Sequence, residues 1–202
     1  MKALVINCTL KRSPNPSNTE ALARVVAERL EKDGVDVEIV RAVDLAIEPG
    51  VISEPVRAGD AWPGVHDKLL DAEILVMASP TWLGRPSSVA QQVLERMDAL
   101  MSETDDEGRP VAYNRVAGVV VTGNEDGAHH VISEISGALA DIGYTIPGQA
   151  WTYWHLGPSP GPDYLDDEQG RGWSHRTGRA MAANLYGVAS ALAARPLGAP
   201  PG

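Results

Sequence analysis

The chain has 202 residues, of which 44% are hydrophobic, enough to bury one full-sized core but cramped for two domains. Its formal net charge of −10 argues against a nucleic-acid partner, because its few cations are not gathered into a basic stretch. The single cysteine, Cys8, excludes an internal disulfide framework and a multi-cysteine metal site.

Short apolar runs rich in valine and isoleucine alternate with longer runs of helical period. The predicted strands cover 2–8, 35–41, 72–79 and 115–123, with a last one within 144–154. The predicted helices cover 17–34, 65–72, 87–101, 128–143 and 175–194. This alternation predicts a parallel sheet with helices on both faces. Five strands fit the flavodoxin-like order 2-1-3-4-5, an α/β fold of three layers.

The same pattern indicates a single domain over 1–195, followed by a flexible tail over 196–202. Three stretches, 48–63, 102–114 and 155–172, lie outside the regular alternation, and the last is dense in proline and glycine. No signal-peptide layout precedes the first strand, and no apolar run approaches the roughly 20 residues of a membrane helix. We therefore expect a soluble, cytoplasmic protein.

In a doubly wound sheet, ligands bind outside the carboxyl ends of the strands. Three loops, 8–19, 79–87 and 122–129, are predicted to meet there. The first loop runs into a helix that begins near the sequence Ser-Asn-Thr at 17–19, where backbone N–H groups and the positive end of the helix dipole favour an anion. The alternative is that Ser17 or Asn18 is simply an ordinary N-cap.

The residues upstream of this helix favour the anion site. Thr9, Lys11, Arg12 and Ser13 add hydroxyl and cationic donors that a cap alone does not need. Residues 7–22 contain no glycine, so neither the P-loop of nucleoside triphosphatases nor the Rossmann dinucleotide fingerprint is present. The sequence predicts that a different phosphate compound binds here.

This loop resembles the phosphate loop of the flavodoxin-like NAD(P)H-dependent FMN reductases. Two further motifs are similar to that family: Ser-Pro-Thr-Trp-Leu-Gly at 79–84, and Thr-Gly-Asn-Glu-Asp-Gly at 122–127. The resemblance implies that backbone amides of 80–84 face flavin N5 and O4, and that 122–127 lies near the pyrimidine edge. The residues that it implies for cofactor binding are Thr9, Arg12, Ser17, Asn18, Thr19, Pro80, Thr81, Trp82, Leu83, Gly84, Thr122, Gly123, Asn124 and Gly127.

The chemistry of the second and third loops agrees with these roles. Trp82 offers a flat apolar face, and Gly84 permits a backbone φ that a side chain disfavours. The alternative is a plain turn with Trp82 packed in the core. Glu125 and Asp126 would oppose a reduced, anionic flavin, so we expect them to point outward or to cap the following helix.

The resemblance implies an FMN-dependent oxidoreductase that takes hydride from NADPH or NADH and reduces a quinone, free flavin or similar small acceptor. The flavin carries this chemistry, so no catalytic side chain and no metal are expected. The resemblance implies a homodimer or homotetramer, and the aromatic cluster at 151–155 is either core or a subunit contact, with the family's dimers favouring the contact. Two alternatives stay open: a flavodoxin-type electron carrier between proteins, and a flavin-free binding module.

The chain departs from the family pattern in its first loop. Cys8 and Thr9 stand where the family has Gly-Ser, and Pro14 and Pro16 make the loop stiffer and longer than the common form. We expect these changes to alter the affinity for FMN.

Overall fold

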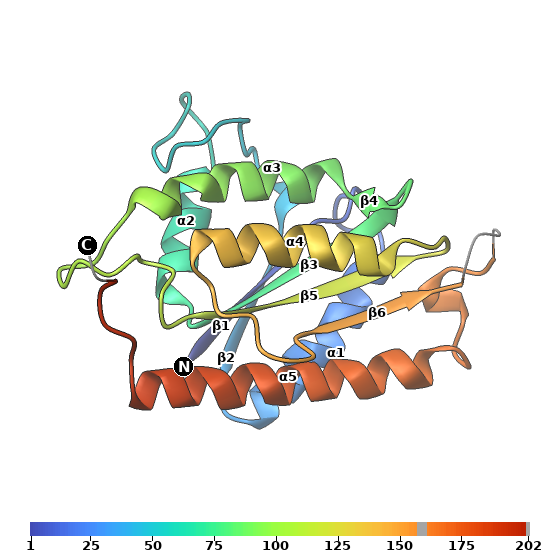
Figure 1. Cartoon of the computed structure of the whole chain (residues 1–202). Helices are drawn as coiled ribbons and strands as arrows, with labels where there is room; N and C mark the ends of the chain where they lie inside the picture. The colour runs from blue at the N-terminus through green and yellow to red at the C-terminus, as the bar shows by residue number, and fades with distance from the viewer. Residues whose placement is uncertain (157–160, 201–202) are drawn as a thin grey trace.

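The computed structural model describes residues 1–156 and 161–200 (Figure 1). Its main sheet is parallel, with the order β2-β1-β3-β5-β6, which confirms the predicted order of five main strands. The strands are β1 (Lys2–Asn7), β2 (Asp36–Arg41), β3 (Ile74–Trp82), β5 (Val116–Gly123) and β6 (Trp151–His155), with a short β4 (Arg85–Pro86) antiparallel to β3. The helices are α1 (Asn18–Lys32), α2 (Trp62–Asp71), α3 (Ser88–Met97), α4 (Ala128–Ile142) and α5 (Arg171–Ala194).

Helices cover both faces of the sheet, as Figure 1 shows. Side chains alternate along each strand, so Leu4 and Ile6 of β1 pack toward α2, α3 and α4, whereas Ala3 and Val5 pack toward α1 and α5. The central strands β1, β3 and β5 are buried on both faces, which explains their nearly continuous apolar sequences. The result is the three-layer α/β fold that the sequence predicts.

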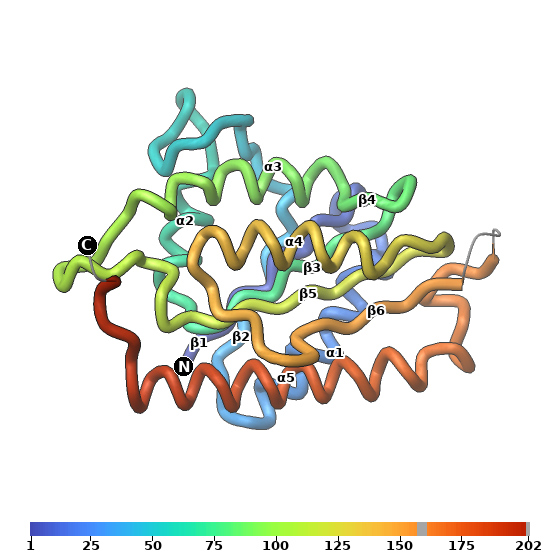
Figure 2. The backbone as a smooth tube through the Cα atoms, in the orientation of Figure 1, coloured from blue at the N-terminus to red at the C-terminus, as the bar shows by residue number. Residues whose placement is uncertain are grey.

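Since β1, β3, β5 and β6 are parallel, their carboxyl ends lie along one edge of the sheet (Figure 2). The loops that follow β1, β3 and β5 therefore meet there. Short 3₁₀ helices complete the chain at Ala42–Asp44, Asp98–Ser102 and Tyr164–Asp166.

Two predicted boundaries are wrong in ways that matter for the site. β3 does not end at residue 79 but continues to Trp82, because it pairs with β4 as a hairpin. The last helix begins at Arg171 rather than at 175, inside the stretch 155–172 that the sequence assigns to irregular structure. All prolines of that stretch precede Asp163, so they do not prevent helix formation after it. Residues 157–160 of this stretch, and residues 201–202 of the predicted tail, lie outside the described residues.

Candidate functional site

A pocket of about 150 Å³ lies at the carboxyl edge of the sheet, where the three loops meet. Ligands of doubly wound sheets bind where the strand order reverses, and β1 and β3 flank that point here. The residues that line the pocket are Thr9, Leu10, Lys11, Asn18, Thr19, Pro80, Thr81, Trp82, Thr122, Gly123, Asn124, Trp154 and Asp163.

One wall of the pocket is the N-terminus of α1. Ser17 is the N-cap, and its Oγ accepts a hydrogen bond from the backbone N–H of Glu20. The N–H of Ala21 donates to the carbonyl of Ser17. These bonds leave the N–H groups of Asn18 and Thr19 without an acceptor inside the helix. The positive end of the helix dipole therefore faces the pocket, an arrangement that suits an anion.

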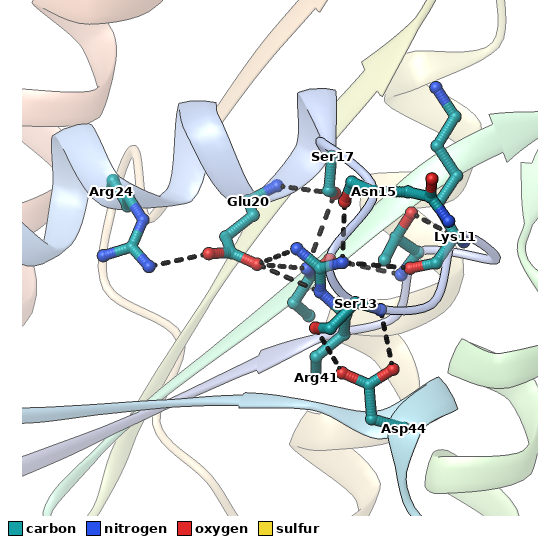
Figure 3. A network of polar contacts seen from close by, with 10 residues as sticks. Lys11, Ser13, Asn15, Ser17, Glu20, Arg24, Arg41 and Asp44 are labelled. Atoms are coloured by element: carbon teal, nitrogen blue, oxygen red, sulfur yellow. Dashed lines mark hydrogen bonds and ion pairs between the residues drawn. The ribbon is translucent and has the colours of Figure 1, made fainter.

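A guanidinium group holds the loop that precedes α1, as Figure 3 shows. Arg41, at the end of β2, donates to the backbone carbonyls of Lys11 (3.2 Å) and Asn15 (2.9 Å). Arg41 also forms a 2.7 Å ion pair with Glu20 in the first turn of α1. Burial disfavours the charged form of Glu20, but hydrogen bonds from Arg41 and Arg24 outweigh it and hold the pKa of Glu20 below its usual value. The loop and the helix start are locked together.

Three of the polar side chains in the first loop lie outside the pocket lining. Ser13 Oγ donates to the carboxylate of Asp44 at 2.5 Å, and the hydrogen bonds from Ser13 lower the pKa of Asp44. Ser17 is buried as the N-cap, and Arg12 is exposed. The sequence alternative in which Ser17 caps the helix is therefore realised, and its role in phosphate binding stays a prediction.

The other polar residues predicted for this loop and its neighbour do line the pocket. Thr9, Asn18 and Thr19 come from the β1–α1 segment, and Thr122 comes from β5. The hydroxyl oxygens of Thr19 and Thr122 lie 2.7 Å apart, so these two side chains are joined by a hydrogen bond. The structure thus brings together residues separated by more than 100 positions.

The second wall is the hairpin formed by β3 and β4. Leu83 and Gly84 make its two-residue turn with φ of 51° and 73°, the left-handed conformation that tight hairpins require. Trp82 lines the pocket and is 55% exposed, so the alternative in which it packs in the core is wrong. Thr81 also lines the pocket, and its Oγ1 is buried without a hydrogen-bond partner among the described residues. Leu83 is 93% exposed and lies outside the pocket lining.

Glycines let the third loop approach this hairpin closely. A Cβ on Gly127 would lie 2.7 Å from Gly84 Cα, and one on Gly123 would lie 3.0 Å from Thr81 Cβ. Gly127 also has a φ of 103°. Gly123 lines the pocket, whereas Gly127 packs against the hairpin outside it.

The two acidic residues of the third loop differ in their surroundings. Glu125 Oε1 accepts a hydrogen bond from the backbone N–H of Gly84 at 3.3 Å, so this carboxylate ties the two loops together. Asp126 is exposed. Neither side chain caps α4, whose N-cap residue is Gly127.

Two residues that line the pocket come from outside the predicted loops. Trp154, in β6, donates from Nε1 to Asp167 at 3.2 Å and packs edge-on against Tyr164. Its position was foreseeable, because the predicted sheet order puts the end of the last strand beside the end of β5. Asp163 lies in the stretch predicted as irregular, and no sequence pattern marks it.

Among the described residues, no group of three or more His, Cys, Asp or Glu side chains is arranged to hold a metal ion. Within the same residues, no helix is long and apolar enough to cross a membrane. Cys8 is fully buried, and burial raises the pKa of its thiol, so it is not an accessible thiolate.

Residues 1–155 match the family model described as NADPH-dependent FMN reductase. The chain is 36% identical over 206 residues to 8-demethyl-8-aminoriboflavin-5'-phosphate synthase of Streptomyces davaonensis, covering 97% of this chain and 80% of the relative. It is 40% identical over 200 residues to the divalent metal cation transporter MntH of Mycobacterium bovis, covering 96% of this chain but only 29% of that relative.

Two solved structures of flavin-binding proteins are also similar to this chain. RosB with the bound intermediate 8-demethyl-8-formylriboflavin-5'-phosphate superposes with a TM-score of 0.90 at 35% identity, over 98% of this chain and 82% of that chain. An NADH:FMN oxidoreductase has a TM-score of 0.64 at 12% identity, over 96% of this chain and 91% of that one, which shows the shared fold alone. The chain belongs to the NADPH-dependent FMN reductase family of flavin-dependent oxidoreductases, with the flavodoxin-like fold.

Proposed function

We propose that this chain binds FMN in the pocket and acts as an oxidoreductase, taking hydride from NADPH or NADH and reducing a quinone, free flavin or similar small acceptor. The observation that carries the proposal is one pocket lined both by the start of α1, which favours an anion, and by Thr81, whose buried Oγ1 has no hydrogen-bond partner among the described residues. An unpaired buried donor costs free energy unless a ligand satisfies it. The residues present therefore fit a phosphorylated flavin.

The phosphate end of the ligand is assigned to the start of α1. The free N–H groups of Asn18 and Thr19 would donate to a phosphate, and Thr9 and Lys11 also line the pocket. Arg41 keeps this loop in place by holding two of its backbone carbonyls, so little ordering is needed when a phosphate binds.

The ring of the flavin is assigned to the hairpin and the β5–α4 loop. Trp82 supplies an apolar surface, and Thr81, Gly123 and Asn124 supply polar groups close to it. The pocket volume of about 150 Å³ is below the roughly 300 to 1,000 Å³ of typical small-molecule sites, so this chain encloses only part of the ligand. The rest is left for a substrate or for a second copy, and the predicted homodimer or homotetramer would supply the latter.

When bound, FMN supplies the hydride chemistry of the reaction. The chain's own residues bind the phosphate, hold the ring and leave one face accessible. Hydride transfer to the flavin requires only that the two reactants are positioned correctly, so we assign no general acid or base among the described residues.

The test is to mix the FMN-loaded protein with NADPH, and separately with NADH, in the absence of oxygen. Loss of the visible flavin absorbance with either nucleotide, at a rate that rises with its concentration, is the expected result. If neither nucleotide bleaches the flavin while dithionite does, the protein is not an NAD(P)H-dependent reductase. The flavodoxin-type electron carrier then becomes the better assignment.

A second candidate function is that riboflavin 5'-phosphate is the substrate rather than the cofactor. The observation that favours it is the 36% identity over 97% of this chain to a protein named as a synthase of 8-demethyl-8-aminoriboflavin-5'-phosphate. Mass spectrometry of the flavin after incubation under air distinguishes the two. An unchanged flavin mass after many reduction cycles favours the reductase, and a new flavin species favours the synthase.

A further inference from the structure

Helices α1 and α5 pack together on one face of the sheet (Figure 1). A groove of about 310 Å³ is lined by residues of both helices. The residues that line it are Ala21, Val25, Glu28, Arg29, Lys32, Tyr164, Leu165, Arg171, His175 and Arg179. Ala21 and Val25 are apolar members of the lining on α1, and polar side chains from both helices surround them. None of these residues lines the flavin pocket.

The charge of this groove is opposite to that of the whole chain. Four lining side chains are cationic and only Glu28 is anionic, in a protein of net charge −10. On α5, Arg171, His175 and Arg179 follow one another at intervals of four residues, which places them on one face of the helix. Cations therefore extend along the length of the groove.

Not all of these cations are engaged by other groups. Arg29 pairs with Asp33 at 2.5 Å, and Arg171 Nε donates to the carbonyl of Tyr164 at 2.7 Å. Lys32 and Arg179 are exposed, and no hydrogen bond or ion pair within the described part of the chain involves either side chain. Two uncompensated cations thus lie on opposite helices of one concavity.

His175 also lines the groove, between Arg171 and Arg179 on α5. His175 Nε2 lies 2.8 Å from the hydroxyl of Tyr164, which is buried. Burial, and then the charges of Arg179 and Arg171, lower the pKa of His175, and Glu28 opposes them only in part. Burial and the neighbouring cations therefore both disfavour a positive charge on His175.

The groove also adjoins the flavin pocket. Asp163 lines the pocket, whereas the next two residues, Tyr164 and Leu165, line the groove. The N–H of Leu165 donates to Asn18 Oδ1 at 3.2 Å, which fixes this segment to the start of α1. The segment from Asp163 to Leu165 therefore separates the groove from the pocket.

We propose that the groove between α1 and α5 is a second anion site, which binds a phosphate group of a nucleotide or free phosphate. Guanidinium and ammonium groups from two helices line this groove, and both kinds of group bind phosphate through charge-assisted hydrogen bonds. The net charge of −10 disfavours a nucleic acid as the source of the phosphate. The proposal concerns a site separate from the flavin pocket and does not require FMN to bind.

The test follows the imidazole of His175 by NMR during pH titrations with NADP⁺, NAD⁺ or inorganic phosphate, in the protein with and without FMN. The variant His175→Gln identifies the resonance. A bound phosphate is expected to raise the pKa of His175, since it offsets the charges of Arg171 and Arg179. Isothermal titration gives the dissociation constants of the same ligands.

Variants of the two uncompensated cations complete the test. Arg179→Ala and Lys32→Ala are each expected to weaken phosphate binding about fivefold, whereas Arg176→Ala, an exposed residue on the same helix outside the groove, leaves it unchanged. Circular dichroism checks that each variant is folded.

The ligands distinguish the source of the phosphate. If NADP⁺ raises the pKa of His175 more than NAD⁺ and inorganic phosphate do, the groove binds the extra phosphate of NADP⁺. If the three ligands raise it equally, the groove binds free phosphate. Either result supports the site if Arg179→Ala weakens it. The proposal is overturned if none of the three ligands changes the pKa of His175, or if binding is insensitive to both variants. Failure of FMN to bind would contradict the proposed function and leave this test intact.

Discussion

The hydroxyl of Thr81 is the residue-level feature on which the flavin assignment can be tested most simply. It is buried at the pocket without a hydrogen-bond partner among the described residues, so its burial costs free energy unless a ligand pairs with it. We predict that Thr81→Val weakens FMN binding about fivefold and leaves the free energy of unfolding unchanged or raised by up to about 1 kcal/mol. Fluorescence titration and urea denaturation measure the two quantities.

A matched control is Thr152→Val, at an equally buried threonine away from the pocket. Thr152 Oγ1 donates to the carbonyl of Ser174 at 2.8 Å, so its loss should cost about 1 kcal/mol of stability and leave FMN affinity unaltered. Equal effects of both variants on affinity would contradict the role of Thr81.

Cys8 gives a second prediction at this scale. Its side chain is fully buried and burial raises its pKa, so the native protein should react with a thiol reagent such as Ellman's only as fast as it unfolds. The measurement compares the reaction at pH 8 with and without denaturant. Fast labelling of the native protein would show that the loop after β1 opens.

At the scale of elements, Arg41 decides whether the first loop is ordered before a ligand arrives. We predict that Arg41→Lys weakens FMN binding about tenfold, because an ammonium group cannot hold two carbonyls and Glu20 with the planar geometry of a guanidinium. Lys68→Arg, on the exposed face of α2, is the control for a lysine–arginine exchange. Unchanged affinity in Arg41→Lys would mean that the loop is ordered by other contacts.

The segment before α2 is held by a fully buried ion pair between Arg96 and Asp60, 3.0 Å apart. Burial favours the neutral form of Asp60, but backbone N–H groups of Val56, Trp62 and Glu48, and then Arg96, outweigh it and lower its pKa. A lowered pKa means that this contribution to stability is complete above the unfolded pKa of about 3.9 and is lost as pH falls through the folded value.

We therefore predict that the free energy of unfolding falls on acidification below about pH 4. Asp60→Asn should cost about 3 to 5 kcal/mol at pH 7, because it leaves the charge of Arg96 buried and unpaired. Urea denaturation of both proteins at several pH values measures this. A cost below about 1 kcal/mol at pH 7 would mean that the pair opens to solvent.

The sequence predicts the elements well because their signals are local. Valine-rich runs separated by amphipathic helices define both the sheet and its order. The hairpin of β3 and β4 escaped prediction because Leu83 adopts a left-handed φ that its residue type disfavours. Pairing of β3 with β4 and the contacts of Gly84 with the β5–α4 loop hold the turn. Similarly, Arg41 carries no motif, and only the neighbouring position of β2 brings it to the loop.

At the scale of the whole molecule, the arrangement of loops at one sheet edge follows from the fold, but the exact lining does not. Trp154 follows from the sheet order, but Asp163 reaches the pocket from the segment after β6, which carries no family motif. The Ser17 side chain caps α1 instead of lining the pocket, because the N-terminal N–H groups of a helix need an acceptor. The sequence does not show whether a hydroxyl at a helix start caps the helix or faces a ligand, because the same residue type suits both roles.

The central claim is that the start of α1 binds the phosphate of FMN. The most direct measurement compares the affinities of the protein for FMN and for riboflavin, which differ only by that phosphate. Two charge-assisted hydrogen bonds from the helix start predict that FMN binds about a hundredfold more tightly, with a difference that shrinks as salt is added. Equal affinities for the two flavins, or no binding of either, would contradict the account.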